Sequence, residues 1–318
     1  MSDDAAISSR NAARPANSAH APGSAIRRGD ISFLADDGFA LKGTLFEGSG
    51  TRPLVLISSA TAVPRGLYAG FAEAVVRAGA RAALIYDYRG TGGSSRPAGW
   101  KKRIGMKDWA LLDLPAAARA LDAVSPDHPM VGVGQSYGGQ ALGLSGIPGR
   151  FLRYGMVATM SGYWRGLDDR LAGPRMFLVG VPASLLFRDM PRRLGVGEPI
   201  PGSVFRDWAR WCRMPDYFFD DPSLPETARY RDVRTPILAI GLTDDPWGTR
   251  RAVRALMRHY ENAHVEERWL SPSDGGGQKI GHLGFFRSRF AETLWPQFAA
   301  WLLDGTPMTI GTTSDAQA

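Results

Sequence analysis

Gly134-Gln135-Ser136-Tyr137-Gly138 is the segment from which the architecture of this 318-residue chain is most readily predicted. It follows the apolar run Met130–Val133 and precedes a helix-like stretch of small residues that begins at Gly139. A serine between glycines at a strand-to-helix corner is typical of a nucleophile elbow, because the tight turn leaves no room for flanking side chains. The corner holds the serine hydroxyl out of the sheet, and the amino end of the helix directs N–H groups toward a developing oxyanion. The sequence therefore predicts that Ser136 is a nucleophile.

Short apolar strands alternate with helical segments on both sides of this corner. Strands of this kind, when helices separate them, form a mostly parallel sheet with both faces covered. We therefore expect an α/β fold with helices on both faces of a central sheet. The expected strands form a hairpin over 31–46 and run over 53–57, 81–86, 130–133, 154–159, 236–240 and 264–270, and the expected helices cover 68–78, 109–124, 250–260 and 289–303.

The alternation stops over residues 161–232, which contain many aromatic side chains and prolines and no clear strand. We expect this region to form a helical cap inserted between two parts of the core, 29–160 and 233–306. Residues 1–28 are rich in Ala, Ser, Asn, Pro and Gly without periodicity, and residues 307–318 have a similar composition. Both ends are therefore predicted to be disordered tails.

The composition indicates a globular protein, with 44% hydrophobic and 22% charged residues. The formal charge of +7 comes mostly from arginines scattered along the chain, and no run of Lys and Arg with interleaved aromatic residues resembles a nucleic-acid module. We interpret this charge as general surface basicity and expect no nucleic-acid partner. A polyanion-binding role is the alternative.

Signals for a membrane, for secretion and for disulfides are weak. The longest apolar run, Met176–Phe187, is too short to span a membrane and contains a proline. The first residues lack the charged-then-apolar order of a secretory signal, so we expect a cytoplasmic protein. The single cysteine, Cys212, cannot form an intrachain disulfide, and we interpret it as a packed thiol.

A serine hydroxyl is a weak nucleophile at neutral pH and needs a base, which in turn needs an orienting acid. Asp244 and Asp245 follow the strand expected over 236–240, at the strand end where ligands bind in parallel sheets. We favour Asp244 as the acid. Asp245 is the alternative, because adjacent side chains point in different directions and only one can reach the histidine. His282, on a glycine-rich loop before the last expected helix, is the favoured base.

The order Ser136, Asp244, His282 on an alternating β/α chain resembles the α/β-hydrolase superfamily over roughly residues 30–305. The segment from Asp87 to Ser94 is similar to the D-x-R-G-x-G-x-S segment after the fourth strand of many members. The resemblance implies a catalytic triad that needs no cofactor or metal.

Two further segments refine this resemblance. Gly281–Phe286 is similar to the histidine loop of bacterial lysophospholipase-like and serine-aminopeptidase-like hydrolases. Asp87 and Arg89 would, by the same resemblance, brace the loop near the elbow rather than act on a substrate.

The oxyanion hole implied by this resemblance has two backbone donors. One is the N–H of Tyr137, the residue after the nucleophile, and the other comes from the loop after the strand 53–57. Many relatives have His-Gly in that loop, whereas this chain has Ser58-Ser59-Ala60-Thr61. By position the second donor is Ala60, with Thr61 as the alternative. Backbone donors do not depend on side-chain identity, so the mechanism tolerates the difference.

The expected reaction is acyl transfer to water through an acyl-enzyme on Ser136. The aromatic and aliphatic side chains of the cap favour a small-molecule carboxylic ester with an apolar acyl or aromatic group, although they could equally pack the cap onto the core. Peptide or amide cleavage, and transfer to an acceptor other than water, are alternatives on the same triad. A non-catalytic ligand-binding module is the alternative from another class of protein.

Overall fold

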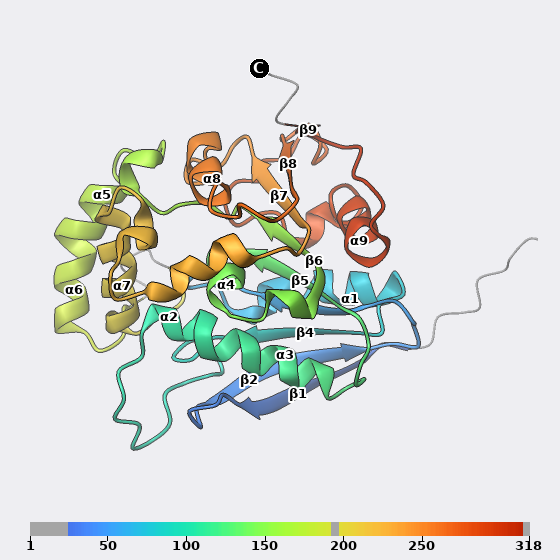
Figure 1. Cartoon of the computed structure of the whole chain (residues 1–318), viewed down its shortest axis with the longest axis horizontal. Coiled ribbons are helices and arrows are strands. Elements are labelled where there is room, and N and C mark those ends of the chain that lie inside the picture. The colour runs from blue at the N-terminus through green and yellow to red at the C-terminus, as the bar shows by residue number, and fades with distance from the viewer. Residues whose placement is uncertain (1–24, 192–196, 314–318) are drawn as a thin grey trace, which may run out of the picture.

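The computed structural model describes residues 25–191 and 197–313, and its centre is a nine-stranded sheet (Figure 1). In chain order the strands are β1 (Arg27–Leu34), β2 (Ala40–Glu47), β3 (Leu54–Ser58), β4 (Ala82–Asp87), β5 (Met130–Gln135), β6 (Phe151–Val157), β7 (Ile237–Leu242), β8 (Val265–Leu270) and β9 (Thr312–Thr313). The α-helices are α1 (Ala69–Arg77), α2 (Met106–Asp108), α3 (Leu114–Asp122), α4 (Tyr137–Leu144), α5 (Ala172–Pro174), α6 (Val181–Leu186), α7 (Gly202–Arg213), α8 (Arg250–Met257) and α9 (Trp295–Asp304).

Shorter helical segments of other types join these elements. Two are π-helical, η2 (Trp109–Asp113) and η5 (Arg175–Gly180). The 3-10 segments are η1 (Arg65–Tyr68), η3 (Pro148–Arg150), η4 (Trp164–Gly166), η7 (Tyr217–Asp220), η8 (Pro225–Asp232) and η9 (Ser288–Phe290).

The strands lie in the order β1-β2-β4-β3-β5-β6-β7-β8-β9. The six strands from β4 through β8 in this order are parallel, and β1, β2 and β9 pair antiparallel at the two edges. The predicted α/β fold with a mostly parallel sheet is therefore confirmed. In the register of β3 and β5, Ser58 lies beside Gly134, so the loop after β3 and the elbow after β5 leave the sheet side by side.

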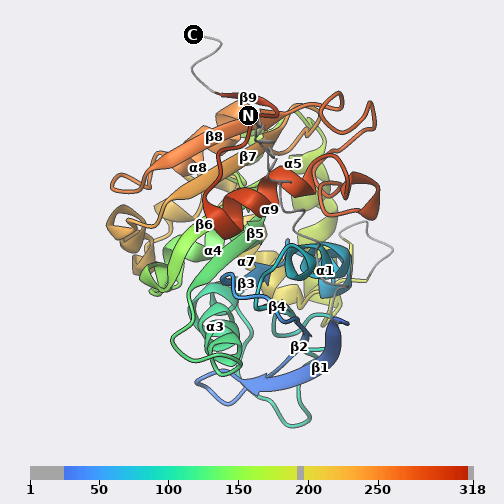
Figure 2. The ribbon, with the colours of Figure 1, turned by 90° about the vertical axis from the view of Figure 1, so that its right-hand side faces the viewer.

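Two apolar cores cover the two faces of the sheet. Successive residues of a strand point to opposite faces. On β3, Leu54 and Leu56 belong to the core shared with α3, α4 and α8, whereas Val55 and Ile57 belong to the core shared with α1 and α9. Figure 2 shows α3 and α4 on one side of the strands and α1 and α9 on the other. Burial on both faces explains why these strands are continuous apolar runs.

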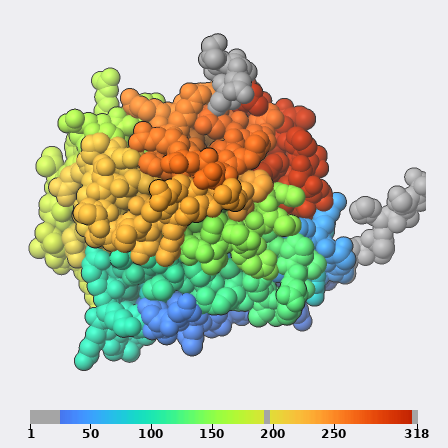
Figure 3. Space-filling view, in the orientation of Figure 1, coloured from blue at the N-terminus to red at the C-terminus, as the bar shows by residue number. Residues whose placement is uncertain are grey.

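The region between β6 and β7 forms a cap of helices at one end of the sheet, on the left in Figure 1. Within its described residues, regular pairing is limited to an isolated bridge between Asp189 and Pro201. The regular elements in the described part of residues 161–232 are helical, which agrees with the expected cap. The cap forms the left-hand edge of the surface in Figure 3.

Some boundaries differ from the prediction. Arg27 and Arg28 belong to β1 rather than to a tail, and Thr312–Thr313 pairs with β8 as β9. Of the predicted tails, residues 1–24 and 314–318 lie outside the described residues. The last helix begins at Trp295 instead of near residue 289, because the proline that follows suits a first helical turn.

Candidate active site

The corner between β5 and α4 has the strained geometry that the glycine pattern predicts. Ser136 has φ 51° and ψ −114°, a region that residues with a side chain rarely occupy. A Cβ on Gly134 would lie 2.2 Å from the carbonyl carbon of Gly138, and a Cβ on Gly138 would lie 2.2 Å from the carbonyl oxygen of Ser58. Both glycines are therefore required by close backbone contacts, and the elbow holds Ser136 at the end of the strand.

Ser136, His282 and Asp245 form a hydrogen-bonded chain at this corner. The Oγ of Ser136 lies 3.1 Å from Nε2 of His282, and Nδ1 of His282 lies 2.7 Å from Oδ2 of Asp245. The Asp245 side chain is fully buried, and that of His282 is 14% exposed. A buried carboxylate on Nδ1 fixes the orientation and tautomer of the imidazole, which leaves Nε2 to receive a proton from the serine.

The prediction that Asp244 reaches the histidine is wrong. The two oxygens of Asp244 accept hydrogen bonds from the backbone N–H groups of Ile280 and Gly281, at 2.8 and 2.9 Å. The adjacent side chain of Asp245 points to the imidazole instead. Asp244 therefore holds the backbone of the histidine loop, and Asp245 contacts the ring itself.

The environment of Asp245 keeps its carboxyl group ionised. Burial raises the pKa of Asp245. The hydrogen bond and charge of His282 and the N–H groups of Trp247 and Gly248 lower this pKa by more than burial raises it, so it lies below the usual value of 3.8. An ionised carboxylate is the form that can stabilise an imidazolium.

One of the two predicted oxyanion donors is already engaged. Tyr137 is the first residue of α4, so no carbonyl within the helix can accept its N–H. The N–H of Ala60, by contrast, donates to the hydroxyl of Tyr68 at 2.9 Å. This bond argues against Ala60 as the second donor. In the described part of the chain, the N–H of Thr61 has no hydrogen-bond acceptor, which favours the alternative.

The bond from Ala60 to Tyr68 is the start of a buried chain that reaches the histidine loop. Tyr68 donates to Oε1 of Gln135 at 2.6 Å, and Nε2 of Gln135 donates to the carbonyl oxygen of His282 at 2.9 Å. Sequence reasoning missed Tyr68 and gave Gln135 no role, although Gln135 lies inside the elbow motif. The network ties together the loop after β3, the elbow and the histidine loop.

Asp87 and Arg89 brace the loop after β4. Asp87 accepts hydrogen bonds from the N–H groups of Arg65 and Gly93 and forms an ion pair with the Arg65 side chain. The buried guanidinium of Arg89 pairs with Asp37 and with Asp113, at 2.7 and 2.6 Å. These contacts agree with the structural role that the family resemblance implies.

Aromatic side chains connect the triad to the cap. The Trp247 ring lies 5.4 Å from the imidazole of His282 and 6.3 Å from the Trp208 ring of α7, measured between ring centroids. Its indole Nε1 donates to Asp169, near the start of the cap, at 3.1 Å. Ser136 is only 9% exposed. Aromatic contacts therefore run from His282 through Trp247 to the cap, and Ser136 itself is largely buried.

Other candidate features have simpler explanations. Cys212 is buried, and burial raises the pKa of its thiol, so it is a packed side chain as predicted. His259 stacks on Phe219 and contacts Asp216, away from the triad. Across the described ranges, no three potential metal ligands gather in one place, and no helix has the length and apolarity needed to cross a membrane.

Comparison with known proteins identifies the family of the fold. Residues 54–302 match the model of the alpha/beta hydrolase family. No curated protein matches the sequence. Among solved structures, DcsB, determined in complex with its substrate analogue, has a TM-score of 0.60 at 16% identity, covering 88% of this chain and 100% of that chain.

Two esterases have the same fold. An esterase from Pyrococcus furiosus has a TM-score of 0.58 at 15% identity and covers 87% of this chain and 91% of its own. The esterase domain of a Rhodothermus marinus protein has a TM-score of 0.54 at 16% identity, with 86% and 97% covered. At these identities the likeness concerns the fold alone.

Proposed function

Because this chain belongs to the alpha/beta hydrolase family, we propose that it is a serine hydrolase that cleaves carboxylic esters through an acyl-enzyme. The observation that carries the proposal is the continuous chain from Ser136 Oγ through the His282 imidazole to the buried Asp245 carboxylate. A hydroxyl, an imidazole and a carboxylate in this order are what nucleophilic catalysis by serine requires.

In the first half-reaction, Ser136 Oγ attacks the ester carbonyl carbon as its proton passes to Nε2 of His282. The carbonyl oxygen becomes an oxyanion, which the N–H groups of Tyr137 and Thr61 stabilise by about 3 kcal/mol each. The bond from the carbonyl carbon to the alcohol oxygen then breaks, and the leaving alcohol takes the proton from Nε2. Asp245 stabilises the imidazolium present between these two transfers.

In the second half-reaction, water replaces the alcohol. His282 removes a proton from the water as its oxygen attacks the acyl-serine. The tetrahedral intermediate collapses, the bond to Ser136 Oγ breaks, and Oγ recovers a proton from Nε2. The products are a carboxylic acid and the free enzyme.

An apolar acyl or aromatic group is the proposed substrate feature. The rings of Trp247 and Trp208 extend from the triad histidine to the cap, so an apolar group bound beside the nucleophile would contact them. Burial of such a group against aromatic surface contributes about 25 cal/mol to the binding free energy for each Å² of apolar surface removed from water.

A fluorophosphonate probe tests the nucleophile. We expect wild-type protein to be labelled and the Ser136→Ala variant to remain unlabelled, because the probe phosphonylates only an activated serine. Labelling that persists in Ser136→Ala would refute the assignment of this serine. A folded wild-type protein without labelling would favour a non-catalytic ligand-binding module.

A substrate panel separates the possible reactions. We expect p-nitrophenyl esters to be hydrolysed faster than aminoacyl-nitroanilides, and longer or aromatic acyl groups to be preferred to acetyl. Faster release of nitroaniline would identify a peptidase or amidase instead. Products formed only with an added alcohol or amine would identify an acyltransferase.

A further inference from the structure

The outermost helix of the cap presents large apolar side chains to solvent. α5, η5 and α6 follow one another without a break from Ala172 to Leu186. Along this segment Leu178, Leu185 and Leu186 are 76%, 70% and 80% exposed. The exposed positions recur at helical spacing and are mostly apolar: Leu171, Pro174, Arg175, Leu178, Val179, Pro182, Leu185 and Leu186. We call this row of residues the apolar stripe.

The buried side of the same segment carries small residues. A Cβ on Gly173 would lie 2.5 Å from the Trp164 ring, and a Cβ on Gly180 would lie 2.3 Å from the Phe205 ring. Ala183 and Ser184 complete this side. A surface helix normally buries its large apolar side chains and exposes polar ones. Here small residues fill the closest contacts and Met176, Phe177 and Val181 are partly buried against the core. Several large leucines are nevertheless left outside, which marks the stripe as a contact surface.

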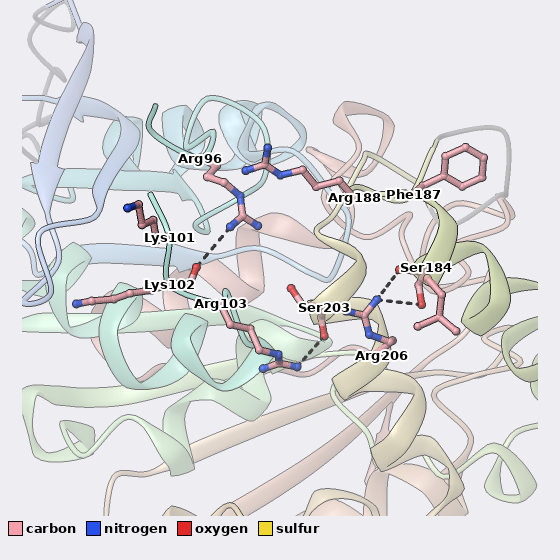
Figure 4. A pocket seen from close by; sticks show the side chains of 10 residues that line it. Arg96, Lys101, Lys102, Arg103, Ser184, Phe187, Arg188, Ser203 and Arg206 are labelled. Carbon is pink, nitrogen blue, oxygen red and sulfur yellow. Dashed lines mark hydrogen bonds between the residues drawn. The ribbon is translucent and has the colours of Figure 1, made fainter. Parts of the chain in front are cut away.

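A basic hollow of about 400 Å³ borders the apolar stripe. Leu185 lies both in the stripe and in the lining of the hollow, so the two features are continuous. Figure 4 shows cationic side chains that reach the hollow from the loop after β4, from the segment that follows α6 and from α7. The cations of the lining are Arg96, Lys101, Lys102, Arg103, Arg188 and Arg206.

Most of these cations have no acidic partner. Arg103 pairs with Asp207 at 2.5 Å. For the other five cations of the lining, no carboxylate within the described ranges lies at ion-pair distance. Arg96 and Arg206 contact the carbonyl oxygens of Lys102 and Ser184 instead. The lining therefore carries a net positive charge. This cluster could not be predicted from the sequence, because its members come from three separate segments.

We propose that the apolar stripe and the basic hollow together form a surface that docks on an anionic lipid bilayer. The stripe would enter the boundary between head groups and acyl chains, and the cations would contact lipid phosphates. An apolar helical face bordered by Lys and Arg is the arrangement that lies in a membrane interface.

A second copy of the chain fits this surface less well. Two copies joined through the stripe by a twofold axis would bring their basic hollows close together, and like charges at short range repel. An anionic bilayer complements both parts of the surface. The proposal requires no hydrolase activity, so it can be tested independently of the function of Ser136.

Sedimentation with vesicles tests the proposal on the full-length protein. We expect binding to vesicles of phosphatidylcholine and phosphatidylglycerol to be at least about tenfold stronger than binding to phosphatidylcholine alone, and to weaken as the salt concentration rises. Equal binding to both vesicles, or no binding to either, would overturn the proposal.

Two double variants separate the contributions of charge and apolar contact. Lys101→Gln with Lys102→Gln should weaken binding about 25-fold, or about fivefold for each cation removed. Its matched control, Arg231→Gln with Arg234→Gln, removes two exposed charges elsewhere and should retain wild-type binding. Leu185→Ser with Leu186→Ser should weaken binding at least about tenfold. The single change Leu152→Ser, at another exposed leucine, should not.

Two results would identify another occupant, and a third would show that binding is not specific to this surface. If inorganic phosphate alone protects the wild type against thermal unfolding, and vesicles do not bind, the hollow is a site for a free anion. If sedimentation equilibrium shows a dimer that Leu185→Ser with Leu186→Ser dissociates, the stripe joins two copies. If both controls lose binding as much as the test variants, the surface is not specific. Circular dichroism of each variant shows whether the fold is retained.

Discussion

Asp244 and Asp245 are neighbours with different contacts, and this difference predicts different losses of activity. Asp245→Asn places an amide against Nδ1 of His282 and favours the wrong imidazole tautomer, so kcat should fall roughly 10⁴-fold. Asp244→Asn keeps one acceptor for the N–H groups of Ile280 and Gly281 and loses the other, which should lower the free energy of unfolding by about 1–3 kcal/mol. Its kcat should fall much less than that of Asp245→Asn. Ester hydrolysis and urea unfolding of both variants measure these effects. A larger fall of kcat in Asp244→Asn would reverse the assignment.

The lowered pKa of Asp245 also predicts how stability depends on pH. A carboxyl group whose pKa is lower in the folded than in the unfolded protein stabilises the fold above its unfolded pKa, near 3.8, and this contribution is lost as the pH falls through the folded value. As the pH is lowered from 5 to 2, the difference in free energy of unfolding between wild type and Asp245→Asn should therefore shrink. Urea titrations followed by tryptophan fluorescence would measure it. A difference that stays constant over this range would contradict the prediction.

The positions of the proposed nucleophile and base could be predicted from sequence, whereas those of the proposed acid and second oxyanion donor could not. Ser136 and His282 each lie in a distinctive glycine-rich motif. Asp244 and Asp245 are chemically identical and adjacent, so only the direction of each side chain separates them. The predicted role of Ala60 is disfavoured because its N–H donates a hydrogen bond to Tyr68, and the sequence does not reveal that contact.

Among the elements, the buried chain from Ala60 through Tyr68 and Gln135 to His282 joins three loops of the sheet edge. Tyr68→Phe would leave two buried polar groups without a partner, which should lower the free energy of unfolding by about 1–3 kcal/mol. We expect kcat to fall on the order of tenfold to hundredfold with KM nearly unchanged, because the change acts on the placement of catalytic groups.

Tyr88→Phe is the matched control for this network. The hydroxyl of Tyr88 is buried and makes no hydrogen bond with the residues that the structure describes, so its removal should leave kcat unchanged. Equal losses of kcat in both variants would show that Tyr68 supports the fold in general rather than the positions of the catalytic loops.

The strands were predictable because burial on both faces makes each a continuous apolar run between turns. Helix boundaries were less predictable. The helix expected over 109–124 contains the π-helical η2, and a single period of 3.6 residues does not reveal this change. The cap was predicted to be helical, but the sequence did not show which face of α6 is buried. In α6 the small side chains face inward and the leucines face solvent, which reverses the usual placement.

For the molecule as a whole, the cap and the core meet at the active site through Trp208 and Trp247. Trp208→Ala removes the aromatic surface that the cap places against Trp247, so kcat/KM for long-chain or aromatic esters should fall about tenfold relative to acetate esters. Trp208→Phe should restore most of this preference. Parallel loss for all acyl lengths would indicate that Trp208 only packs the cap onto the core. Steady-state rates over a series of acyl lengths measure the effect.

The path of the chain also controls when activity can begin. Ser136 and His282 are 146 positions apart, and the strands between them must first take their places in the sheet. During synthesis Ser136, its strained corner and the cap all precede His282, the proposed base. A nascent or truncated chain that ends before residue 282 would therefore carry a nucleophile without reactivity. On the proposed mechanism, esterase activity after refolding should recover no earlier than the docking of the histidine loop.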